Sequence, residues 1–131
     1  MEHIDKKLIS ELFEQAEVNP RLRQSYDLRT STNDHSQRML NALLPGTVVP
    51  IHRHPKSTEN VFLLWGKLVE IFYDEKGKEI ERILLDPTTG NYGCVVPQGV
   101  WHTVEVIEPS VIFEAKDGKY GEDGSETLEQ L

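Results

Sequence analysis

The sequence contains a single cysteine, Cys94, and this scarcity excludes both an intrachain disulfide and the paired cysteines that bind zinc as thiolates. Any metal site must therefore use histidine, aspartate or glutamate. The sequence also lacks an apolar run near the roughly 18 residues of a membrane-spanning helix. Its first residues lack the basic and apolar segments of a signal peptide. We therefore expect a cytoplasmic protein with no membrane partner.

Positive charge is also scarce, with 14 Lys and Arg residues against 22 Asp and Glu residues and a net charge of −8. A negative protein is repelled by the phosphate backbone of nucleic acids, so we expect no nucleic-acid partner. The length of 131 residues suits one globular domain and leaves no room for two.

Two patterns of apolar residues divide the chain. Helical spacing over residues 4–16, closed by Asn19 and Pro20, predicts one amphipathic helix with a packing role. From Gln37 onward, β-prone runs alternate with turn residues, which indicates a β-sandwich or barrel. The predicted strands are 48–51, 61–65, 68–73, 80–85, 94–96, 101–106 and 111–113. We divide the chain into a helix and arginine-rich lead-in (1–36), a barrel (37–116) and an acidic, loosely held tail (117–131).

Three histidines and a glutamate have the spacing of a metal site. His52 and His54 are two residues apart in a segment that reads as a strand, so both side chains leave the same face. Glu59 follows after four residues, and His102 can reach the site from a neighbouring strand. Such a ligand set suits a first-row divalent ion. Taken singly, a His-x-His pair on an exposed strand is more often a surface feature, and a lone histidine is more often a hydrogen-bonded structural residue.

The joint spacing resembles the two motifs of the cupin superfamily. The first is carried by Gly46, His52, His54, Glu59 and Gly66, and the core of the second by Pro97, Gly99 and His102. At a finer level, residues 37–42, 52–55 and 101–103 resemble the WbuC-type cupin-fold metalloproteins. These are small bacterial proteins associated with O-antigen and other surface-polysaccharide gene clusters.

The resemblance implies an all-β, single-domain cupin fold (a double-stranded β-helix or jelly-roll barrel) with an N-terminal α-helix. It implies one divalent metal, Fe, Mn, Zn, Ni or Co, bound by His52, His54, Glu59 and His102. An ion that prefers six ligands then keeps two positions for water, substrate or dioxygen, which is a catalytic arrangement.

Five of the six arginines gather between positions 18 and 54. Because the guanidinium fork binds carboxylates and phosphates at two points, this cluster favours a small anionic ligand. Arg38 and Arg53, the arginines nearest the metal motif, are the predicted substrate-binding residues. The equal alternative is that these arginines pair with carboxylates of the acidic remainder of the chain or of a partner subunit.

The leading hypothesis for function is a metal-dependent enzyme of isomerase or epimerase, dioxygenase or lyase type. Its substrate would be a small anion such as a sugar or sugar-nucleotide intermediate of surface-polysaccharide synthesis, with the catalytic residues unassigned. The alternative is a non-catalytic saccharide- or metabolite-binding or sensor module. We also expect a homodimer in which the helix or an edge strand covers apolar surface.

Overall fold

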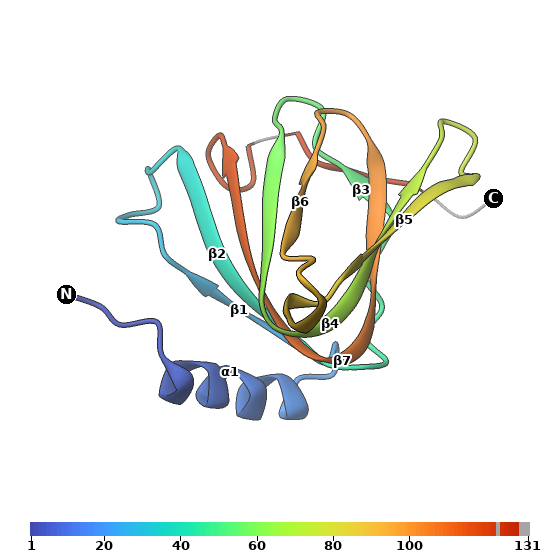
Figure 1. The fold of residues 1–131 in the computed structure, drawn as a ribbon. Coiled ribbons are helices and arrows are strands. Elements are labelled where there is room, and N and C mark those ends of the chain that lie inside the picture. Colours follow the sequence, from blue (N-terminus) through green and yellow to red (C-terminus); the bar gives the residue numbers. More distant parts are fainter. Residues whose placement is uncertain (123, 129–131) are drawn as a thin grey trace.

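A computed structural model describes residues 1–122 and 124–128 of the chain, which form one helix packed beneath a barrel of strands (Figure 1). No helix among these residues is both long enough and apolar enough to cross a membrane. The elements in chain order are α1 (Lys6–Val18), β1 (Arg23–Asp27), β2 (Ser36–Leu43), β3 (His52–Arg53), β4 (Glu59–Tyr73), β5 (Glu79–Leu85), the 3-10 helix η1 (Pro87–Thr89), β6 (Gly93–Val96), β7 (Trp101–Asp117) and β8 (Glu126–Thr127).

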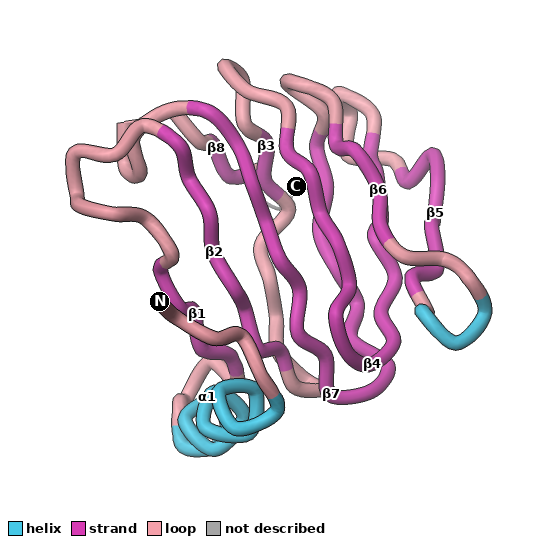
Figure 2. Tube along the Cα trace, turned by 60° about the vertical axis from the view of Figure 1, so that its left-hand side comes forward, coloured by secondary structure: helices cyan, strands magenta, loops and turns pink. Residues whose placement is uncertain are grey.

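Helix α1 begins where Asp5 caps it, since the Asp5 carboxylate accepts a hydrogen bond from the Leu8 amide at 3.0 Å. Its apolar side packs on the outer face of the sheet, where Leu12 and Ala16 are buried against β2 and β7 (Figure 2). The predicted helix is therefore confirmed, and its apolar stripe is used for packing within the chain.

The two longest strands, β4 and β7, are the frame of the barrel. They pair antiparallel from Glu59 opposite Lys116 to Tyr73 opposite Trp101, with three register shifts between Leu63 and Leu68. Such irregularities bend a strand pair, so each strand runs through both halves of the barrel. Strands β1, β2 and β6 extend one half, and β3, β5 and β8 extend the other.

Gly66 lies in this bend and has a left-handed φ of 94°. A Cβ atom on this residue would lie 2.2 Å from the Pro109 carbonyl oxygen of β7, a separation no side chain tolerates. Only glycine fits both the backbone angle and the close approach of the two strands. Beyond the bend the halves enclose an apolar core that includes Leu63, Leu68 and Ile112.

The all-β barrel with one N-terminal helix agrees with the prediction, but the strand limits do not. Strands β1 and β2 were absent from the predicted set, because their sequences contain no β-branched residue. Strand β1 falls in the predicted lead-in 1–36, yet it pairs with β2 and belongs to the sheet. No strand covers 48–51; β3 begins directly afterwards, at His52.

The predicted acidic tail 117–131 also contributes to the sheet. Strand β8 pairs with β3, and the Leu128 amide donates to the Ile51 carbonyl at 2.8 Å. The part of this tail at residues 123 and 129–131 lies outside the described residues. A short C-terminal strand thus lies directly beside the segment that carries His52 and His54.

Candidate metal centre

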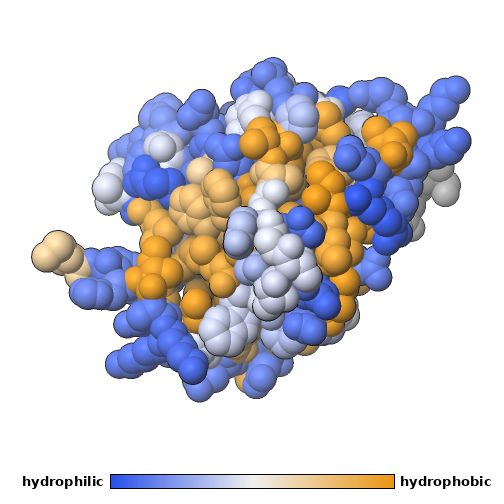
Figure 3. Space-filling model, viewed as in Figure 1, coloured by the Kyte–Doolittle hydropathy of each residue, from blue (hydrophilic) through white to orange (hydrophobic). Residues whose placement is uncertain are grey.

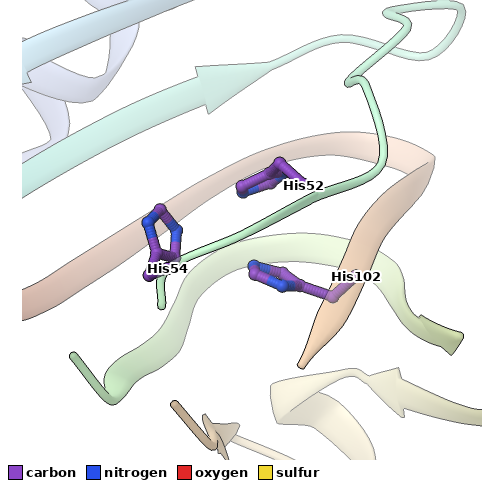
Figure 4. A group of neighbouring side chains, drawn as sticks. All are labelled: His52, His54 and His102. Carbon is purple, nitrogen blue, oxygen red and sulfur yellow. The ribbon is translucent and has the colours of Figure 1, made fainter. Parts of the chain in front are cut away.

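Strand pairing brings the three predicted histidine ligands together. His52 on β3 lies opposite His102 on β7, and His54 follows one residue after β3 ends. One ring nitrogen from each histidine lies within 4.8 Å of the others, and the three side chains converge in Figure 4. Residues 50 positions apart in the sequence therefore meet at one point.

Glu59, the first residue of β4, completes the predicted ligand set. Its Oε2 lies 3.2 Å from the His54 Nε2, and its Oε1 lies 3.7 Å from the His102 Nε2. Lys116, the register partner of Glu59 on β7, places its Nζ 3.2 Å from the same Oε2. The carboxylate is thus held at the edge of the imidazole cluster by a neighbouring cation.

The outward-facing nitrogen of each imidazole is already engaged. The Nδ1 atoms of His52 and His102 donate to the carbonyls of Pro50 and Val100 at 2.8 Å and 2.9 Å. The Nδ1 of His54 lies 2.8 Å from the Ser125 hydroxyl oxygen. Bonds of this kind fix the ring and its tautomer, which leaves the Nε2 atoms to face the centre of the cluster.

The buried nitrogen of His102 provides a test of whether a metal fits. His102 is 2% exposed, and among the described residues its Nε2 has no hydrogen-bond partner. A buried nitrogen in this state costs free energy unless something accepts its lone pair. Three imidazole nitrogens and one carboxylate form a donor set that suits a first-row divalent ion, so the residues present fit a metal. The ligand role of each of the four residues stays a prediction.

The pKa shifts differ among the members of the cluster, and those of His52 and Glu59 favour cation binding. Burial and the neighbouring His102 lower the pKa of His52 to about 4, so His52 is neutral near pH 7. Burial alone would raise the pKa of Glu59, but the neighbouring imidazoles of His102 and His54 and the charge of Lys116 outweigh it and hold that pKa well below its usual value. Burial would lower the pKa of His102, but Glu59 and the Val100 carbonyl outweigh it and raise that pKa.

A cavity of about 370 Å³ opens beside the cluster and shares His52, Glu59 and His102 with it. Its wall also contains two further carboxyl groups, those of Glu70 and Glu114. Glu70 is 1% exposed, and its burial raises its pKa to about 8. Burial likewise raises the pKa of Glu114. At neutral pH the Glu70 carboxyl therefore holds a proton inside the cavity.

The sequence interpretation missed Glu70, although a signal was present. Leu68, Glu70 and Phe72 share one face of β4, and both apolar neighbours are buried in the core. A carboxylate between two core positions of one strand face marks a buried acid, which is uncommon without a partner.

The two arginines predicted to bind substrate lie in ion pairs, and of the two only Arg53 pairs with the acidic remainder of the chain. The Nη2 of Arg38 lies 2.9 Å from Asp34, and the Nη2 of Arg53 lies 2.7 Å from Glu126. Arg53 also stacks over the Trp101 ring, with 4.4 Å from its Cζ to the ring centroid. Neither arginine lines the cavity; Arg21 and Arg23 do. Substrate binding by Arg38 and Arg53 stays an untested prediction.

Solved structures similar to this chain share its barrel. The capsular polysaccharide assembling protein CapF from Staphylococcus aureus is 20% identical, with a TM-score of 0.63 over 74% of this chain and 27% of CapF. Oxalate decarboxylase from Lactobacillus farciminis is 16% identical, with a TM-score of 0.61 over 81% of this chain and 30% of the enzyme. This chain thus spans about a third or less of the length of either protein.

A neighbour of similar length is TT1209 from Thermus thermophilus, which is 23% identical, with a TM-score of 0.65 over 90% of this chain and 98% of that chain. These likenesses confirm the cupin fold. No curated protein matches the sequence. Residues 4–85 match the family described as a domain of unknown function (DUF6016), and the chain belongs to that family.

Proposed function

We propose that this protein is a metal-dependent cupin enzyme that acts on a small anionic substrate. The observation that carries the proposal is the convergence of His52, His54 and His102 beside a cavity of about 370 Å³, whose wall contains His52, His102 and Glu59. A structural metal site is normally saturated by protein ligands, whereas four donors leave positions open on an ion that prefers six. Those positions would face the cavity that His52, Glu59 and His102 line.

The chain's own residues supply binding and proton transfer. When bound, the metal supplies Lewis acidity toward a substrate oxygen. The buried Glu70 carboxyl holds a proton at neutral pH and lines the same cavity, so it can donate that proton to a bound substrate. The Lys116 ammonium holds Glu59 in place through their 3.2 Å contact.

The proposed substrate is a sugar or sugar-nucleotide intermediate of surface-polysaccharide synthesis. The resemblance to WbuC-type proteins supports this setting, and the shared fold with CapF is consistent with it. Isomerase or epimerase, dioxygenase and lyase reactions are all compatible with the ligand set.

The first experiment measures metal content and turnover in the same preparation. Protein purified without chelators is analysed for Fe, Mn, Ni, Zn and Co. It is then incubated with sugar nucleotides, sugar phosphates and small carboxylic acids, and products are followed by NMR. We expect one metal per chain and conversion of at least one compound. The His52→Ala/His54→Ala variant is the matched control, because it removes two predicted ligands and should abolish both readouts.

A non-catalytic binding or sensor module is the competing function. It predicts saturable binding of one of these compounds with no product at any metal occupancy. That outcome, with full metal content, would overturn the enzyme proposal.

We also propose that the protein is a homodimer. Helix α1 already covers the outer face of β1 and β2, so it is not the free surface. The outer face around β4 and β6 instead exposes Phe62, Leu64, Tyr92 and Val95, and Figure 3 shows apolar side chains on this side of the molecule. Light scattering at micromolar concentration tests this, with Phe62→Ser expected to shift the population toward monomer.

A further inference from the structure

The six arginines of the chain fall into two groups. Arg21 and Arg23 have no carboxylate partner among residues 1–122 and 124–128, and both line the cavity. Each of the other four forms an ion pair, namely Arg29 with Asp27 at 2.8 Å, Arg38 with Asp34 at 2.9 Å, Arg53 with Glu126 at 2.7 Å and Arg82 with Glu79 at 2.8 Å. The cavity thus holds the two arginines that form no ion pair within the described part of the chain.

The guanidinium of Arg23 is half-buried and held in place. Its Nη1 donates to the Val48 carbonyl at 2.8 Å, which ties β1 to the segment before β3. Burial and the charge of Arg21 both lower the pKa of Arg23, so the two cations are close enough to repel each other. Two like charges in a partly desolvated wall are unfavourable unless an anion lies between them.

The backbone between these arginines is strained. Leu22 has a φ of 56°, and among the described residues it is the one non-glycine with a positive φ. The Asn19 side chain accepts from the Arg21 amide at 2.8 Å, and the Leu44 amide donates to the Leu22 carbonyl at 3.0 Å. A residue keeps such a strained conformation only where surrounding contacts enforce it. Strained residues of this kind are frequent in segments that bind ligands.

We propose that Arg21 and Arg23 bind the oxyanion of a hydroxylated ligand, with the body of that ligand extending along the cavity toward the metal centre. Polar side chains for hydroxyl groups follow in the same wall, at Ser25 and its register partner Asn41. This inference rests on the proposed function, which makes the cavity the substrate site.

Glu114, a carboxyl group of the cavity wall, lies far from Arg23 along the sheet. Arg23 pairs with Leu43 of β2, whereas Glu114 pairs with Met39, four positions away. Four residues of strand correspond to roughly 13 Å. The cavity therefore has a cationic end and a metal end, which fits a sugar acid or a sugar phosphate better than a neutral sugar. Both ligands share an oxyanion on a polyhydroxylated carbon skeleton.

Isothermal titration calorimetry with three probes tests the proposal. D-gluconate and D-glucose 6-phosphate carry the two candidate oxyanions, and D-glucose is the neutral control. We expect wild-type protein to bind at least one anion about tenfold or more tightly than glucose. Arg23→Ala should weaken the binding of that anion by about tenfold or more. Arg23→Lys should recover only part of the lost affinity, because a point charge lacks the guanidinium fork. Tighter binding of gluconate identifies a carboxylate ligand, and tighter binding of glucose 6-phosphate identifies a phosphate ligand.

Two further variants at exposed side chains show whether a loss of anion binding comes from the missing guanidinium and not from misfolding. Arg21→Ala removes an exposed side chain and is expected to weaken anion binding at least threefold. Arg82→Ala removes the same charge from an exposed ion pair and should leave binding unchanged. Anion affinity within twofold of wild type in both Arg21→Ala and Arg23→Ala overturns the proposal, as does the failure of wild type to bind either anion at millimolar concentration.

The same titrations on His52→Ala/His54→Ala separate this site from the enzyme proposal. Arginine-dependent anion binding in both wild type and this variant, with no turnover in fully metal-loaded wild type, supports the anion site and refutes the enzyme. Turnover that is insensitive to Arg21 and Arg23 supports the enzyme and refutes the anion site.

Discussion

The two ends of the cavity are built differently. At the metal end, His54, Glu59 and His102 are buried, and the outward nitrogen of each imidazole is held by an oxygen atom. At the arginine end, Arg21 is exposed, and the one side-chain hydrogen bond of Arg23 goes to a backbone carbonyl. The metal end is therefore preorganised for one ion, whereas the arginine end is open to solvent and to exchange of a ligand.

The origin of this difference lies in the strand pairing. The metal residues come from β3, β4 and β7, which are paired with one another or with β8. The arginines come from the turn after α1 and the start of β1, which is paired only with β2 among the described strands. We expect perturbations of the metal end to be larger, and the predictions below test that order.

The largest expected effect is the loss of a histidine ligand. His54→Ala or His102→Ala should weaken metal binding by about 100-fold or more, because each removes a preorganised donor from a set of four. Competition titration against a chelator measures this, and circular dichroism checks that the fold is kept. Arg21→Ala is the control and should leave metal affinity unchanged. Full metal occupancy in a His52→Ala/His54→Ala variant would show that the ion binds elsewhere.

Lowering the pH should weaken metal binding at the metal end and leave the positive charge of the arginine end unchanged. A histidine must be neutral to ligate metal, so protons compete with the ion as the pH falls through the imidazole range near about 6.5. The pKa of His102 is raised, whereas the pKa of His52 is lowered to about 4. As the pH falls, His102 should therefore be protonated before His52. Metal affinity measured from about pH 7.5 to pH 5 should fall steadily, whereas the cationic charge of the arginine end should persist. A metal affinity that is constant over this range would argue against histidine ligands.

A smaller effect is expected when the support of one ligand is removed. The Ser125 hydroxyl oxygen lies 2.8 Å from the His54 Nδ1, from a position 71 residues away. Replacing such an outer partner typically costs about 10–100-fold in metal affinity, and we expect about tenfold for Ser125→Ala because the ring remains buried. Thr127→Ala, an exposed change on the neighbouring β8, is the control. Equal metal affinity in Ser125→Ala and wild type would show that burial alone orients His54.

The sequence predicted the metal end far better than the arginine end, and strand geometry explains why. His52 and His54 share a face because they are two residues apart, and the same alternation sends the intervening Arg53 to the opposite face. On β2, Met39 and Asn41 line the cavity, so Arg38 points away from it. Nearness in sequence to the metal motif therefore did not identify the arginines that line the cavity, Arg21 and Arg23.

Other features depend on pairing between distant segments and leave little local signal. Ser125 reaches His54 only because β8 pairs with β3, and a two-residue exposed strand carries no apolar pattern. Strand β1 was equally hard to predict from the local sequence, because its position beside β2 depends on the packing of α1 across both strands. The barrel class could be predicted because β-prone runs separated by turn residues mark its strands, and the first part of β4 alternates buried and exposed residues.

The smallest expected effect is the contribution of the buried Glu70, beside the metal end, to the pH dependence of the unfolding free energy. The pKa of Glu70 is about 8 in the folded protein, against an ordinary value of 4.5. Between these values the unfolded chain releases a proton that the folded protein retains, so stability from Glu70 is greatest below about pH 4.5 and is lost as the pH rises toward 8. The amide of Glu70→Gln does not titrate, so this variant lacks that slope. Denaturant unfolding of the two metal-free proteins should therefore shift in favour of Glu70→Gln by about 1 kcal/mol between about pH 6 and pH 7. Taking the difference cancels the titration of the histidines, which is common to both proteins. A difference in unfolding free energy that does not change with pH would mean that Glu70 is ionised in the folded protein, and that the cavity wall beside the metal end is as solvated as the arginine end.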